Sequence, residues 1–137
     1  MKKKVTELIV CLLFVICFLT ACHAPQSEKM ADGTYQADVT LTGGSGRATV
    51  DSPAALTVED GEIYATIVWS SQKYDYMLVH GQRYDVLTTE GGSTFEIPVR
   101  ALDTPLTVIG DTTAMSTPHE IEYTLTFDST TAVEAAQ

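Results

Sequence analysis

The chain has little of the chemistry that nucleic-acid-binding and disulfide-stabilised proteins need. It has three cysteines in 137 residues, and Cys11 and Cys17 both lie in an apolar stretch near the amino end. It has eight Lys and Arg against eighteen Asp and Glu, which gives a net charge of −10. This excess of acidic residues disfavours nucleic acid and anionic membrane surfaces as binding partners.

The sequence also lacks a recognisable catalytic motif. It has no Gly-x-Ser-x-Gly turn, no phosphate-binding loop and no His-Glu-x-x-His, and its three histidines are far apart along the chain. The Asp-Gly pairs at 32–33 and 60–61 lack the ligand spacing of a calcium loop. We therefore expect a binding protein and not an enzyme.

The amino end has the pattern of an export signal. Three lysines at 2–4 precede an apolar run of thirteen residues at 8–20, which is too short to cross a bilayer core of roughly 30 Å as an ordinary helix. Residues 19–22, Leu-Thr-Ala-Cys, match the bacterial lipobox. We predict a lipoprotein signal peptide over 1–21 and a lipid on Cys22, which would anchor the protein on the outer face of the cell membrane. The alternative is an ordinary signal peptide followed by a chance cysteine.

Removal of this signal would leave no disulfide in the mature chain, because Cys22 is its only cysteine. The loss of three lysines and Glu7 would change the net charge from −10 to −12. Residues 22–31 lack periodicity and are predicted to form a tether, which would reach roughly 30 Å when extended. Residues 32–129 are long enough for one small domain, and 130–137 are expected to be a flexible tail.

Short strands and turns fill the predicted domain. Apolar residues alternate along 35–41, 63–69 and 74–80, and no segment of ten or more residues has a helical apolar period. Seven to nine strands with turns every eight to twelve residues predict an all-β fold, an immunoglobulin-like antiparallel β-sandwich. Pro98 cannot donate a hydrogen bond to a sheet, so its strand is expected at an edge or a bulge.

The clearest strand is the last one, at 119–127. Its apolar face carries His119, Ile121, Tyr123, Leu125 and Phe127. A histidine and a tyrosine at the end that follows a turn are placed either to face a ligand or simply to end the strand. The glycine cluster at 43–46 is likewise either a flexible loop or a close approach to a ligand.

Aromatic residues offer a second candidate surface. Trp69 is expected in the core. The alternation places Tyr74 and Tyr76 on one face, where with Tyr84 they either pack inside or form a patch that binds protein or glycan.

Several segments together resemble the NEAT family. They are residues 52–61, the strand end at 69–71, and residues 93–99, 102–106 and 122–127. NEAT domains are immunoglobulin-like modules on Gram-positive surfaces that bind haem and pass it to lipoprotein receptors. The resemblance covers about 32–128 and implies haem as a cofactor and an iron-transport receptor as a partner.

The resemblance also implies a site. A Tyr-x-x-x-Tyr motif on the family's last strand supplies the iron ligand and its hydrogen-bond partner. Tyr123 matches the second tyrosine, and His119, a competent iron ligand, replaces the first. Met115 is a second possible ligand if the turn folds back, and Ser45 is the serine of the early loop that contacts the porphyrin.

The departures from the family leave two functions open. Only Arg47, Lys73 and Arg83 offer cations for two propionates. The histidine at 119 either preserves haem binding with altered iron chemistry or marks its loss. The alternative is a non-catalytic protein- or glycan-binding immunoglobulin-like module.

Overall fold

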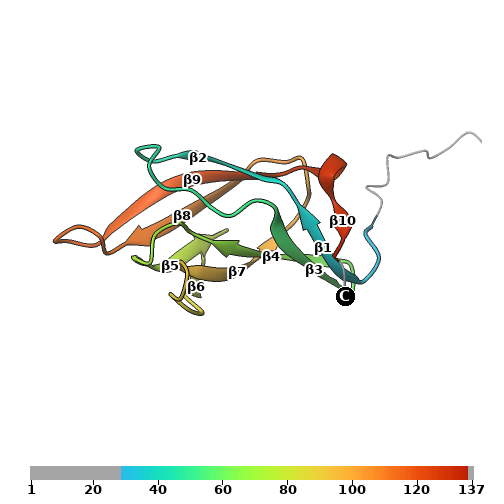
Figure 1. The fold of residues 1–137 in the computed structure, drawn as a ribbon, viewed down its shortest axis with the longest axis horizontal. Coiled ribbons are helices and arrows are strands. Elements are labelled where there is room, and N and C mark those ends of the chain that lie inside the picture. The colour runs from blue at the N-terminus through green and yellow to red at the C-terminus, as the bar shows by residue number, and fades with distance from the viewer. Residues whose placement is uncertain (1–28, 136–137) are drawn as a thin grey trace, which may run out of the picture.

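The computed structural model describes residues 29–135 (Figure 1). The predicted signal peptide, Cys22, most of the predicted tether and residues 136–137 lie outside this range. Within 29–135, no helix has the length and apolar character needed to span a membrane. The fold is a sandwich of two five-stranded antiparallel sheets, which confirms the all-β prediction.

Each sheet combines strands that are distant in sequence. In spatial order, sheet A contains β10 (Val133–Glu134), β1 (Gly33–Ala37), β3 (Ala54–Glu59), β4 (Glu62–Val68) and β7 (Thr94–Val99). Sheet B contains β2 (Val39–Gly43), β9 (His119–Phe127), β8 (Leu106–Thr112), β5 (Tyr74–Val79) and β6 (Gln82–Asp85). Pro98 lies in β7 at an edge of sheet A, as its missing N–H predicted.

The alternating segment 35–41 is divided between both sheets. Asp38 separates β1 in sheet A from β2 in sheet B. Its amide donates to Thr131 Oγ1 at 2.8 Å, and its carbonyl accepts from the Asp128 amide at 2.9 Å. The alternation could not reveal this crossing, because inward side chains remain inward on both sides of it.

The prediction of a flexible tail is wrong for residues 130–135. The chain forms a 3-10 turn, η1 (Ser129–Thr131), and then β10, which pairs with β1. The Asp128 carboxylate caps the turn by accepting from the Thr130 amide at 2.8 Å. A two-residue strand is too short to show a periodic pattern in the sequence.

Inward-facing side chains of both sheets form one core. Trp69 is fully buried, as expected, and its Nε1 donates to Met77 Sδ at 3.5 Å. This contact matters because a buried indole N–H needs a partner. The other large side chains with almost no exposure are Phe95, Phe127, Leu56, Ile67, Ile97 and Leu125.

A β-bulge in β5 separates two tyrosines that the sequence placed on one face. The register of β5 against β8 shifts between Tyr74 and Tyr76, which leaves Asp75 as the extra residue. Tyr74 is consequently buried in the core. Tyr76 instead bonds across the outer face of sheet B to Glu120. The alternative in which Tyr74, Tyr76 and Tyr84 form one exposed patch is therefore wrong.

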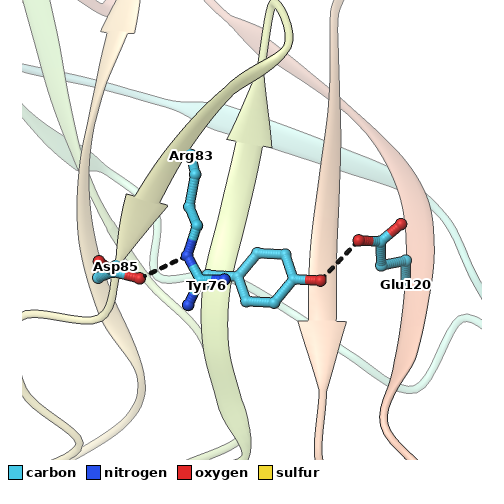
Figure 2. A network of polar contacts seen from close by, with 4 residues as sticks. All are labelled: Tyr76, Arg83, Asp85 and Glu120. Carbon is cyan, nitrogen blue, oxygen red and sulfur yellow. Dashed lines mark hydrogen bonds and ion pairs between the residues drawn. The ribbon is translucent and has the colours of Figure 1, made fainter.

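Side chains on that outer face link edge strand β6 to β9 (Figure 2). The Arg83 Nε donates to Asp85 Oδ1 at 2.7 Å, and the Arg83 guanidinium lies 4.1 Å from the centre of the Tyr76 ring. The Tyr76 hydroxyl donates to Glu120 Oε1 at 2.6 Å, which raises the pKa of Tyr76 to about 12. Figure 2 shows the ring reaching across the intervening strand to Glu120. The network restrains the open end of β9, where Glu120 follows His119.

A buried carboxyl group lies on the intervening strand, β8, between Tyr76 and Glu120. Asp111 of β8 is paired in register with Tyr76 on one side and Glu120 on the other, and it is 5% exposed. Burial, the neighbouring Asp75 carboxyl and the Glu120 charge raise the pKa of Asp111, against a smaller opposing effect of Arg83. Within the described residues, Asp75 Oδ1 is buried without a hydrogen-bond partner. The ionised form of Asp111 therefore destabilises the fold.

Replacing Asp111 by Asn should stabilise the protein at neutral pH. The native state raises the pKa of Asp111, so its carboxyl contributes stability below the unfolded-state pKa of about 4 and loses that contribution as pH rises through the native value. The Asn amide removes the charge and can donate to Asp75 Oδ1. Thermal unfolding should show a gain on the order of 1 kcal/mol, or about 5 °C, at pH 7 and little difference near pH 4.

The matched control is Asp85→Asn. Asp85 is exposed and already paired with Arg83, so neutralising it should give no gain at pH 7. An equal gain in both variants would show that the lower net charge alone is responsible. That result would contradict a specific effect of Asp111.

Candidate functional site

The predicted site residues lie at one end of the sandwich, which we call the hairpin pole. It consists of the loop 43–50 after β2 and the β8–β9 hairpin at 112–119. Figure 1 shows both at the left, while the first and last described residues lie at the right. The hairpin pole is therefore remote from the point at which the amino-terminal segment enters the domain.

Tyr123 of β9 forms the inner wall of this pole. It is 3% exposed, and its ring centre lies 4.9 Å from that of Trp69. Its hydroxyl oxygen is 2.7 Å from the hydroxyl oxygen of Tyr74. The hydrogen bond between the two phenols joins β5 to β9 across sheet B.

Two glycines let the backbone approach these phenols. Gly44 has a φ of 62°, and a Cβ at this position would lie 2.7 Å from Cε1 of Tyr123. A Cβ on Gly110 of β8 would lie 3.1 Å from Cε1 of Tyr74. The glycine cluster of the early loop thus makes a close approach, and what it approaches is Tyr123.

Stacking completes the aromatic cluster. The ring centres of Trp69 and Tyr74 lie 4.3 Å apart at an interplanar angle of 27°, which is a stacked arrangement. Burial, and then the hydrogen bond to Tyr123, raise the pKa of Tyr74 far above its ordinary value. Tyr74 therefore remains a neutral phenol at physiological pH.

His119 is placed quite differently from Tyr123. It is the first residue of β9, pairs in register with Thr112 and is exposed. Within residues 29–135, its ring makes no hydrogen bond or ion pair with another described residue. Its imidazole is therefore free to accept a ligand, while the Tyr76 contact to Glu120 restrains the backbone beside it.

No hydrogen bond between described residues joins the four predicted site residues to one another. Met115 is 57% exposed in the hairpin, and Ser45 is exposed in the early loop. No hydrogen bond within the described chain links either of them to His119 or Tyr123. Positions four apart on a strand are about 13 Å apart, which agrees with the separate environments of His119 and Tyr123.

The sequence does not reveal that Tyr74 is the hydrogen-bond partner of Tyr123. The two are 49 positions apart, and the bulge at Asp75 reverses the face that simple alternation assigns. No local signal in the sequence identifies either effect.

Two cations lie near the hairpin pole. Arg47 is in the early loop, and Lys73 sits beside the hairpin, where its carbonyl accepts from Thr113 N at 2.7 Å. A cavity of about 420 Å³ adjoins the early loop and is lined by β2, Gly46 and residues 48–50. Within 29–135, no group of three His, Cys, Asp or Glu side chains could hold a bare metal ion.

The fold is similar to solved structures of one kind of domain. One is described as the NEAT5 domain of IsdX2, a B. anthracis hemophore in complex with heme. It has a TM-score of 0.59 and 21% sequence identity, with 73% of this chain and 98% of that chain covered. A mutant of the same NEAT5 domain, also with heme, gives a TM-score of 0.60 at 20% identity, with 74% and 98% covered.

No family model and no curated protein matches the sequence. The likeness is therefore one of three-dimensional structure. It covers nearly the whole of the solved domain, and this chain has the fold of a NEAT domain.

Proposed function

We propose that this protein is a NEAT-like surface lipoprotein that binds haem, or a related iron-containing ligand, for iron acquisition. The ligand would bind at the hairpin pole, and a lipid on Cys22 would anchor the protein. The protein would act by binding and transfer, without catalysis.

The observation that carries the proposal is the free imidazole of His119 at the open end of β9. This strand belongs to a fold whose solved examples contain heme. His119 is exposed and restrained on one side by the contact of Tyr76 with Glu120. Such a histidine can approach a planar ligand that brings its own metal.

The residues around His119 fit this group. A single imidazole is insufficient for a bare metal ion, but it suits an iron whose other positions are filled by a porphyrin. The exposed Met115 offers a thioether on the hairpin. Val50 of the pole, Leu41 of β2 and Ile121 of β9 are partly buried and would provide apolar surface for a macrocycle. Bound haem would supply the iron that His119 ligates.

Tyr123 has a different role in this proposal from its role in the family motif. Its hydroxyl is buried and already bonded to Tyr74. It therefore holds β9 against β5 from inside and leaves iron ligation to His119. Ser45, next to Gly44, would approach the other side of the ligand from the early loop.

Two cationic side chains at the hairpin pole could interact with the two haem propionates. Arg47 and Lys73 are at the hairpin pole, whereas Arg83 is paired with Asp85 on the outer face of sheet B. We expect the propionates to lie near the first two and to remain largely solvated.

The position of the pole is consistent with an anchored transfer protein. The described chain begins at the opposite end of the sandwich (Figure 1). A tether leading to Cys22 would present the hairpin pole away from the membrane, where a donor or an iron-transport receptor can reach it. The anchor, the receptor and the location at the cell surface are proposals that rest on the lipobox.

Titration of residues 24–137 with haem tests the site. This segment contains every described strand, so it carries the whole sandwich. We expect a shifted Soret band for the unmodified segment and at least tenfold weaker binding for His119→Ala, with unchanged thermal stability because His119 is exposed. His80→Asn is the matched control, because His80 is exposed in a turn with a φ of 51° that Asn also tolerates.

Two results would count against this assignment. Absence of a shifted band in the unmodified segment would contradict haem binding. A normal band in His119→Ala would remove His119 as the ligand and leave Met115 to be tested in the same way.

Tyr123→Phe separates a supporting role from a ligand role. The substitution leaves the Tyr74 hydroxyl buried without its partner, so it should cost about 1–2 kcal/mol of unfolding free energy. Haem affinity should fall less than in His119→Ala, and the Soret position should be retained. A changed Soret position in Tyr123→Phe would show that the phenol itself reaches the iron.

A further inference from the structure

The end of the sandwich opposite the hairpin pole carries two adjoining cavities that the proposed haem site does not use. The first, of about 690 Å³, lies among the β3–β4 turn, the β5–β6 turn and the end of β7. The second, of about 630 Å³, lies beside residues 29–30 and 129–132. They share the lining residues Gly61, Ile63 and Arg100, and we call the two together the distal groove. Each part is within the size range of ligand sites.

The walls of the distal groove are suited to sugar rings. Tyr64 and Tyr84 line the first part and Tyr35 the second, and all three are only partly buried. The nearly inaccessible Val79 and Val99 form the apolar base of the first part. The C–H face of a pyranose packs on such surfaces, while its hydroxyls need polar groups at the edge. His80 and Gln82 provide these groups.

Two type I′-like turns give this edge a defined shape. Asp60 and Gly61 have φ values of 52° and 78°, and His80 and Gly81 have values of 51° and 75°. Turns of this kind continue the twist of their strands and hold the edge residues in fixed positions.

An unpaired cation lies at the junction of the two cavities. Among the described residues, Arg83 and Asp85 form the only ion pair, so Arg100 has no described carboxylate partner. Two acidic side chains, Glu62 and Asp103, also line the groove, and each accepts hydrogen bonds from a neighbouring residue. Glu62 Oε2 accepts from the Tyr64 hydroxyl at 2.9 Å. The Asp103 carboxylate accepts from the Ser129 hydroxyl and, at 2.9 Å, from the Ser129 amide, and these two contacts lower the pKa of Asp103.

Arg100 lines both cavities, and Lys29 lines the second. Guanidinium binds carboxylate and phosphate through paired N–H donors. Arg100 is thus the complement of an acidic group on the ligand.

We propose that the distal groove binds a saccharide that carries an acidic group, either a carboxylate or a phosphate. Arg100 binds the acid, and Tyr64 and Tyr84 pack against the sugar. Two adjoining cavities of about 690 and 630 Å³ leave room for more than one sugar unit. The predicted tether enters at Lys29 beside this groove, so an anchored protein would turn it toward its own cell envelope.

An anionic lipid surface is the competing partner. The mature charge of −12 opposes approach to such a surface as a whole. A concave groove with aromatic walls also fits a chain of sugar units better than a plane of head groups.

Calorimetric titration of residues 24–137 tests the proposal. The probes are trigalacturonate, an oligomer of glycerol phosphate carrying glucose, and the neutral trisaccharide maltotriose. At least one acidic probe should bind tenfold or more tightly than maltotriose, and the two acidic probes distinguish carboxylate from phosphate. Arg100→Ala should weaken that binding at least fivefold, because the exposed Arg100 contributes the charge without supporting the core.

Matched variants make the result specific. Arg47→Ala removes an exposed arginine at the hairpin pole and should leave sugar binding unchanged. Tyr84→Leu keeps apolar volume but removes the ring, and it should weaken sugar binding with little change in melting temperature. His119→Ala should have no effect, so sugar binding and haem binding can succeed or fail separately.

Several outcomes would overturn the proposal. They are failure of both acidic probes to bind, equal binding of maltotriose, and an equal loss in Arg47→Ala and Arg100→Ala. Binding to phosphatidylglycerol vesicles that depends on Arg100, without binding to the sugars, would assign the groove to a lipid surface instead.

Discussion

The hydrogen bond between Tyr74 and Tyr123 is the contact on which the arrangement of the hairpin pole depends. Both phenols are almost inaccessible to water, and burying either hydroxyl alone would leave it without a partner. The bond requires the bulge in β5, which turns Tyr74 inward, and the absence of a side chain at Gly44 and Gly110. The bond also occupies the Tyr123 hydroxyl, so His119 is the exposed side chain on that face of β9 that is left to bind a ligand.

Side chains on both faces of sheet B hold β9 in place. Inside, the aromatic cluster of Trp69, Tyr74 and Tyr123 fixes the middle of the strand. Outside, the contact from Tyr76 to Glu120 restrains its open end. On the outer face, the neighbouring carboxyl groups of Asp111 and Asp75 repel each other when ionised, which destabilises the fold. Arg83 opposes this only in part, and Asp75 Oδ1 is buried without a hydrogen-bond partner among the described residues.

Much of the fold could be read from the sequence because each feature had a local cause. Alternation along 63–69 and 119–127 placed Trp69, Leu125 and Phe127 inside, and all three are fully buried. Asp60-Gly61 and His80-Gly81 form turns whose cause is also local, because glycine adopts positive φ at little cost. The features that were not predicted depend on residues that are far apart in the sequence. The chain passes from one sheet to the other at Asp38, where the backbone bonds to Thr131 and Asp128. The two-residue strand β10 depends on its pairing with β1.

The sequence by itself determined the class of fold, the turns and the inward face of the last strand, because side-chain alternation and turn chemistry act over a few residues. It also placed His119 and Tyr123 on that strand and left their roles open. Only the tertiary structure decided that Tyr123 is engaged by Tyr74 while His119 is free. A single inserted residue in β5 reverses the faces that follow it, and a hydrogen bond between residues 49 positions apart leaves no pattern in the chain.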